Sequence, residues 1–183
     1  MITHLLSRRT FIVGCLITRA AAAFGFTSIA QKTVDKRNSS EIGEYAVGFA
    51  SKASDGGFDH AFIVWYYSDP NGQRTVRRCA GFYPVSDSST KSYDMILGVS
   101  GKVFDDSKVK ISQEITVLLN KEAFDRAIAI ENQYKNGQTY HLGFGDCTTF
   151  VQNVAASIPG LNIPSRVAHI YPSDFVSALY DAN

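Results

Sequence analysis

The sequence predicts an α+β fold in one domain, preceded by an export leader. Two observations support this fold class: runs rich in β-branched and aromatic residues between turn signals indicate strands, and apolar residues at helical spacing indicate helices. The chain has 183 residues, of which 45% are hydrophobic. It is therefore long enough to bury one sizeable core and too short for two ordinary domains.

Four segments are expected to be strands, and the sheet they form is expected to be antiparallel. The turn signal Asp69-Pro70-Asn71-Gly72 joins the second and third of them as a hairpin. The predicted strands are residues 45–50, 58–66, 74–83 and 110–119. Residues 85–108 are mostly Ser, Asp, Lys and Gly, so we expect a long surface excursion there.

Three helices are predicted in the C-terminal part of the chain. Asn120 is a good cap for the first, which Asn136-Gly137 ends. The second begins at Asp146 and carries apolar residues along one face until Pro159-Gly160. A third, shorter helix is expected after Pro172.

The first 30 residues resemble a bacterial twin-arginine export signal. Ser7-Arg8-Arg9-Thr10-Phe11 precedes a short apolar run, and small residues follow. We therefore divide the chain into a signal (1–30), a flexible lead-in without periodicity (31–43) and a folded domain (44–183). A periplasmic or secreted location is expected.

The fate of the leader stays open at this point. Cleavage is expected inside Ala20–Ala23 or after Ala30, and the alternatives are lipidation at Cys15 or a membrane-associated helix that stays attached. A bilayer span is not expected, because Arg19 ends the apolar run far short of the roughly 20 residues that a spanning helix needs.

Charge gives no indication of a nucleic-acid partner. Residues 1–30 contain three arginines and no acid, so removing them takes the formal net charge from +1 to −2. Nucleic-acid binding normally requires a clustered basic face. We expect no such partner.

Cys147 is the residue most indicative of chemistry. It follows Gly143-Phe144-Gly145-Asp146 and lies in the first turn of the second predicted helix. Unpaired N–H groups and the helix dipole stabilise a thiolate at such a position, which is what a sulfur nucleophile requires. In an oxidising envelope, however, a simple disulfide between Cys147 and Cys79 is the alternative. Twin-arginine cargo folds in the reducing cytoplasm, which weakens that alternative.

His60 is the expected partner of Cys147. It opens a strand whose next residues, Ala61–Trp65, are apolar, and a histidine in that position is costly to bury without a partner. A cysteine at the start of a helix packed on that strand would supply one. Together they would form the nucleophile and base of a thiol hydrolase.

The order of these two motifs resembles the circularly permuted NlpC-type papain-like superfamily, which includes lecithin retinol acyltransferase-like proteins and bacterial envelope hydrolases. The resemblance lies in Asp59-His60-Ala61-Phe62-Ile63-Val64, Asp146-Cys147-Thr148-Thr149-Phe150-Val151 and Tyr171-Pro172-Ser173-Asp174-Phe175. It implies a papain-like fold whose sheet packs against the helix that carries the cysteine. It also implies a third polar residue near the histidine.

That third residue has no clean match in the sequence. Arg78 and Tyr83 could face the imidazole, and we take Tyr83 as the catalytic candidate. We expect His141 and Asp146 to contribute to substrate binding. Residues 74–83 contain no second histidine, which counts against an acyltransferase. The cysteines and histidines lack the paired spacing of a zinc site, so we assign no metal and no cofactor.

The sequence therefore predicts an exported cysteine hydrolase of the amidase or endopeptidase type. Cys147 would attack a carbonyl to give a thioester, and His60 would move the proton. The expected substrate is a cell-wall (peptidoglycan) peptide or another acyl compound. The alternatives are a lipid acyl hydrolase or acyltransferase of the same fold, and a non-catalytic envelope binding protein held by a Cys79–Cys147 disulfide.

Overall fold

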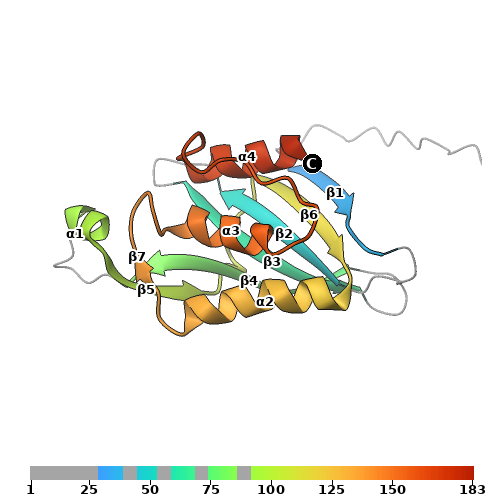
Figure 1. Ribbon diagram of the computed structural model, residues 1–183, viewed down its shortest axis with the longest axis horizontal. Coiled ribbons are helices and arrows are strands. Elements are labelled where there is room, and N and C mark those ends of the chain that lie inside the picture. The colour runs from blue at the N-terminus through green and yellow to red at the C-terminus, as the bar shows by residue number, and fades with distance from the viewer. Residues whose placement is uncertain (1–28, 39–44, 53–58, 69–73, 86–91) are drawn as a thin grey trace, which may run out of the picture.

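A computed structural model of the chain describes residues 29–38, 45–52, 59–68, 74–85 and 92–183 (Figure 1). The predicted twin-arginine motif lies outside the described residues. Within these ranges the protein has an α+β fold with seven strands and four helices. Their bounds in chain order are β1 Ala30–Asp35, β2 Tyr45–Lys52, β3 His60–Ser68, β4 Arg74–Pro84, α1 Ser92–Leu97, β5 Val99–Phe104, β6 Gln113–Leu119, α2 Lys121–Lys135, β7 Thr139–Tyr140, α3 Cys147–Ala156 and α4 Pro172–Ala182.

The strands form one mixed sheet in the order β1-β6-β2-β3-β4-β5-β7. Neighbours from β6 to β7 pair antiparallel, whereas β1 runs parallel to β6. The expectation of an antiparallel sheet is therefore correct except at one edge. The central strand β3 is buried on both faces from His60 to Trp65, which explains its continuous apolar run.

Strand β1 corrects the prediction that residues 31–43 are a flexible lead-in. Residues 30–35 pair with β6 in the register Ala30↔Gln113, while residues 39–43 lie outside the described residues. Val34 packs against the core, and Lys32 Nζ donates a hydrogen bond of 2.8 Å to the carbonyl of Tyr180. An edge strand tolerates polar residues because one of its sides faces solvent, so its composition resembles that of a loop.

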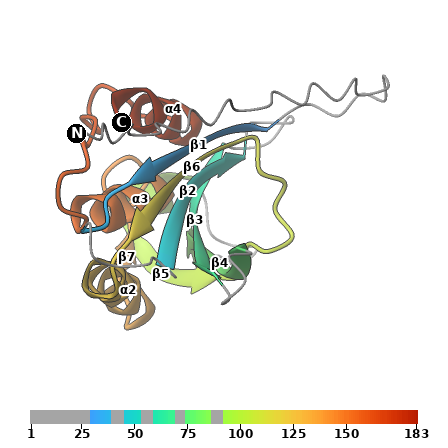
Figure 2. The same ribbon diagram turned by 90° about the vertical axis from the view of Figure 1, so that its right-hand side faces the viewer.

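Helices α2, α3 and α4 cover one face of the sheet (Figure 2). Helix α3 packs mainly on β3 and β4, and α4 packs on β2, β3 and β6. Helices α2 and α3 begin directly after the cap residues that the sequence predicts for them. Asn120 caps α2 by accepting from Ala123 N at 2.9 Å, and Asp146 is the N-cap of α3. The third predicted helix is α4, which begins at Pro172.

The opposite face of the sheet is covered in part by the connection between β5 and β6. Val109 and Ile111 from this connection pack against Ala50, Phe62, Val64 and Cys79. The prediction of one long surface excursion over residues 85–108 is wrong, because α1 and β5 lie within it. Polar residues alternate with half-buried ones along β5, and its pairing with β4 outweighs their weak propensity for sheet. This pairing brings residues 105 and 106 next to the start of β3.

Candidate active site

Cys147 is the first residue of α3, and its position is fixed by the preceding cap. Asp146 Oδ1 accepts hydrogen bonds from the N–H groups of Thr148 at 3.0 Å and Thr149 at 3.1 Å. Among the described residues, no acceptor bonds the N–H of Cys147 itself. The helix start therefore presents the thiol and an available backbone donor on the same residue.

His60, the first residue of β3, lies beside Cys147. The structure brings these two predicted residues together, close enough for the side chain of Cys147 to raise the pKa of His60. Helix α3 packs on β3, the strand that His60 opens. Both side chains are buried, so their interaction is little screened by water.

Asp106 is the third member of this group, and it was missed by the reasoning from sequence. Its Oδ2 lies 2.9 Å from His60 Nε2 within the folded core. Since Nε2 faces the carboxylate, Nδ1 is the nitrogen left to face the sulfur of Cys147. A carboxylate at this position fixes the ring orientation and stabilises the imidazolium.

Tyr83, the predicted third polar residue, lies against the imidazole of His60 and also contacts Asp106. Its hydroxyl donates to Asp106 Oδ1 at 2.7 Å, and its ring stacks on His60 with a centroid separation of 4.4 Å. Burial, followed by the hydrogen bond and charge of Asp106, raises the pKa of Tyr83. The tyrosine therefore stays protonated and holds Asp106 and His60 in place.

Gly81 makes room for the His60–Asp106 pair. It lies between Cys79 and Tyr83 on β4, on the same face of the sheet. A Cβ atom on residue 81 would overlap the Asp106 carboxylate and lie 2.5 Å from His60 Nε2. Only glycine permits this close approach.

The environment of His60 favours its charged form. Burial alone would lower its pKa, but the hydrogen bonds with Asp106 and Cys147, together with the charges of both groups, outweigh burial and raise the pKa to about 9. At neutral pH the imidazole is therefore protonated. A buried imidazolium next to a thiol is the arrangement that a sulfur nucleophile needs.

Asp146 and His141, the two predicted substrate-binding residues, have contacts within the fold. Besides its cap bonds, Asp146 accepts from Gly143 N at 2.9 Å and forms an ion pair of 2.7 Å with Arg166. The ring of His141 lies against Gly98, and its backbone pairs with Gly145. Both residues belong to the segment that leads into α3. The carboxylate of Asp146 is already bonded to groups of the protein itself.

Cys79 is a neighbour of Asp106 and not of Cys147, since Asp106 N–H donates to the carbonyl of Cys79. It is on the face of the sheet opposite α3, in contact with Phe62 and Val64. Cys79 and Cys147 are both free thiols, so the alternative of a disulfide between them is not seen. Burial, followed by the charges of Asp105, Asp106 and Glu114, raises the pKa of Cys79 to about 11. This thiol stays protonated at neutral pH.

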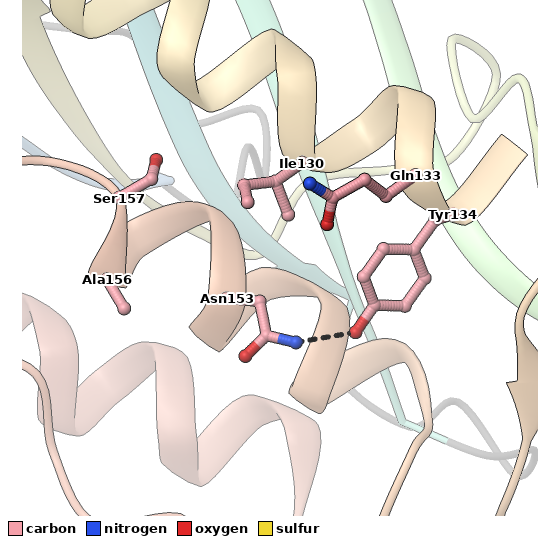
Figure 3. A pocket seen from close by; sticks show the side chains of 6 residues that line it. All are labelled: Ile130, Gln133, Tyr134, Asn153, Ala156 and Ser157. Carbon is pink, nitrogen blue, oxygen red and sulfur yellow. Dashed lines mark hydrogen bonds between the residues drawn. The ribbon is translucent and has the colours of Figure 1, made fainter.

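A shallow cavity lies elsewhere, between α2 and α3 (Figure 3). It is lined by Ile130, Gln133, Tyr134, Asn153, Ala156 and Ser157. Asn153 Nδ2 donates to the Tyr134 hydroxyl at 2.7 Å across it. The residues that α3 contributes lie in its C-terminal half and at its C-cap, away from the Cys147 end. The cavity is therefore separate from the candidate site.

Two classes of feature are absent from the part of the chain that the structure describes. No group of three or more His, Cys, Asp or Glu side chains is arranged to hold a metal ion. None of the described helices has the length and apolar character needed to cross a bilayer.

Comparison with known proteins does not assign the chain to a family. No protein-family model, curated protein or solved structure matches the chain. What can be said of function therefore rests on the residues and their geometry.

Proposed function

We propose that this protein is an exported thiol hydrolase of the permuted NlpC-type papain-like class, which cleaves an amide bond through a cysteine thioester. The observation that carries the proposal is the arrangement of Cys147, His60 and Asp106 at the junction of α3, β3 and the end of β5. A nucleophile, a base and a group that orients the base are the parts that acyl transfer needs.

The proposed reaction begins when the Cys147 thiolate attacks the carbonyl carbon and the carbonyl π electrons move to oxygen. The Cys147 N–H donates to this oxyanion. As the intermediate collapses, the C–N bond breaks and the His60 imidazolium gives its proton to the leaving amine. A thioester on Cys147 remains, and His60 is now neutral.

Water then completes the cycle. Neutral His60 takes a proton from water as the oxygen attacks the thioester, and collapse of the second intermediate releases the acid and the Cys147 thiolate. His60 ends the cycle protonated, as it began. Asp106 keeps the ring oriented in both halves, because its bond to Nε2 leaves Nδ1 directed toward the sulfur.

The substrate proposed for this chemistry is a peptide of the cell wall, in keeping with the twin-arginine motif at the N-terminus. The test is to incubate the purified protein with soluble peptidoglycan peptides and to identify products by mass spectrometry. Cleavage that is lost in Cys147→Ala and retained in Cys79→Ala is the expected result. Absence of cleavage across peptides of varied sequence would contradict the peptide assignment.

Export is proposed on the same motif. Replacing both Arg8 and Arg9 with lysine should leave the precursor in the cytoplasm, because the twin-arginine pathway reads the arginine pair. Fractionation of cells followed by immunoblotting measures the result. Normal export of this variant would remove the twin-arginine assignment without bearing on the hydrolase.

A lipid ester is a second candidate substrate, favoured by exposed apolar side chains near the start of α3. Phe144 is 84% exposed and Val167 is 88% exposed. The segments that carry these two side chains both contact Asp146, which accepts hydrogen bonds from Gly143 N and from the Arg166 guanidinium. Faster turnover of long-chain than of short-chain p-nitrophenyl esters would favour this candidate over the peptide.

A further inference from the structure

Two tyrosines of the core are matched in burial and packing but differ at their hydroxyl groups. Tyr134 is 8% exposed and Tyr140 is 7% exposed, and both rings pack on Phe82, with centroid separations of 4.8 Å and 5.6 Å. The Tyr134 hydroxyl accepts a hydrogen bond from Asn153. Among the described residues, no group bonds the Tyr140 hydroxyl.

An unbonded hydroxyl on a nearly buried tyrosine is unusual. Folded proteins almost always supply a partner for such a group, since leaving it without one costs free energy. The Tyr140 oxygen is not among the fully enclosed polar atoms that lack a partner, so it retains access to solvent. A partner can therefore reach it from outside the protein.

The backbone places Tyr140 next to the nucleophile. Tyr140 ends β7, and the following residues fold back through a bridge in which His141 N donates to Gly145 O at 3.0 Å and Gly145 N donates to His141 O at 2.8 Å. In antiparallel pairing, the positions on either side of a bridge face each other. Tyr140 is therefore opposite Asp146, which directly precedes Cys147.

The Tyr140 hydroxyl also keeps its proton. Burial, followed by the negative charges of Cys147 and Asp146, raises the pKa of Tyr140. A phenol that does not ionise in the working range of pH is a hydrogen-bond donor there. Close to a thiolate nucleophile, a fixed donor is positioned for the negative charge that develops on a substrate oxygen.

We propose that Tyr140 is a catalytic residue whose hydroxyl donates a hydrogen bond to the substrate's carbonyl oxygen during attack by Cys147, as the second donor beside the Cys147 N–H. This inference rests on the proposed thiol hydrolase function. No proton is transferred from Tyr140: the O–H bond remains intact while the oxyanion forms and collapses. The required ligand chemistry is a carbonyl group that becomes tetrahedral.

The change Tyr140→Phe tests this role because it removes one oxygen atom and keeps the ring that packs on Phe82. Removing one donor of an oxyanion site lowers kcat by about 10² to 10³ fold. Substrate binding should change little, because the hydrogen bond strengthens in the transition state. Tyr134→Phe is the matched control, since it removes a hydroxyl of equal burial that is bonded within the fold.

The experiment measures two reactions of Cys147 on the same preparations. The first is single-turnover acetylation by p-nitrophenyl acetate, followed by mass spectrometry of the peptide that contains Cys147; this reaction passes through an oxyanion. The second is alkylation by iodoacetamide, which forms no oxyanion. Thermal midpoints of all proteins show whether each variant is folded.

We expect Tyr140→Phe to slow acetylation by about 10² fold while leaving alkylation at the parental rate, with Tyr134→Phe slowing neither. Equal acetylation of Tyr140→Phe and the parent would overturn the role of Tyr140 and leave the hydrolase standing. A parallel loss of both reactions would show that the residue acts on the thiolate or the fold instead. A parent that cannot be acetylated at Cys147 would refute both proposals.

Discussion

The two cysteines of the folded domain have nearly the same exposure but different chemical surroundings. Cys147 is 6% exposed and Cys79 is 8% exposed. Cys147 begins helix α3, which packs on one face of the sheet, whereas Cys79 belongs to β4 and its side chain packs on the other face. Cys147 lies at a helix start beside the cationic His60, whereas Cys79 lies within a strand near three carboxylates. Burial alone therefore does not tell a nucleophile from a core residue, and the sign of the neighbouring charge does.

Asp106 lies between these two environments and affects each in the opposite sense. Its carboxylate bonds His60 and so supports the cation that faces Cys147. Its backbone N–H bonds the carbonyl of Cys79 at 3.4 Å, and its charge helps to keep the Cys79 thiol protonated. One buried carboxylate thus supports the cation beside Cys147 and also keeps the Cys79 thiol protonated.

The largest expected effect separates the two cysteines by activity. Cys147→Ala and His60→Ala should each remove nearly all hydrolysis, and the double variant should lose little more, because groups that act as one unit are strongly non-additive. Cys79→Ala should retain parental turnover. The two single cysteine variants should keep unfolding free energies within about 1 to 2 kcal/mol of the parent, as measured by denaturant titration. The variants that lack His60 should lose more stability, because they leave the Asp106 carboxylate buried without its partner.

Two outcomes would break this first contrast. A folded His60→Ala protein with parental turnover would remove the histidine from the mechanism. Loss of turnover in Cys79→Ala with an unchanged thermal midpoint would show that the wrong cysteine had been assigned.

A smaller effect is expected from the carboxylate that orients His60. Asp106→Asn removes the charge that supports the imidazolium, so kcat should fall by about 10² fold, within the range typical of general acid–base catalysis. Asp105→Asn is the matched control, because Asp105 is the adjacent residue and bonds only Ser107 among the described residues. Equal rates for the two variants in a steady-state assay would remove Asp106 from the site.

Much of this arrangement is predictable from sequence because its signals are local. The cap at Asp146, the glycine-rich approach to Cys147 and the apolar strand after His60 all lie within a few residues of the groups that they position. The start of each of these elements was therefore close to the prediction.

Asp106 and β1 were missed because their roles depend on contacts distant in the chain. Asp106 is 46 residues from His60, and its neighbours in sequence are polar, so it resembles a solvated loop residue. A signal did exist: the alternation along 99–104 is typical of a strand and places the Asp105-Asp106 pair directly at its end. For β1 the parallel partner β6 begins 83 positions later, and no local pattern marks that pairing.

The last expected effect is the contribution of His60 to the pH dependence of stability, measured as the difference between the parent and a variant that lacks this residue. The folded pKa of about 9 lies above the ordinary value of 6.5. The charge interactions of His60 therefore contribute fully below the unfolded pKa, and this contribution is lost as pH rises through about 9. Thermal midpoints of the parent should fall toward those of His60→Gln over this window. A difference between the two proteins that does not change with pH would contradict the raised pKa.

The central claim is that His60 makes Cys147 the reactive thiol of the folded domain, whereas the Cys79 thiol stays protonated. The most direct measurement is competitive alkylation with limiting iodoacetamide at neutral pH, with both cysteine peptides quantified by mass spectrometry. Because the thiolate is the reacting species, Cys147 should be labelled first, and His60→Ala should slow its labelling without affecting Cys79. Faster labelling of Cys79, or labelling of Cys147 at the same rate with and without His60, would contradict the account.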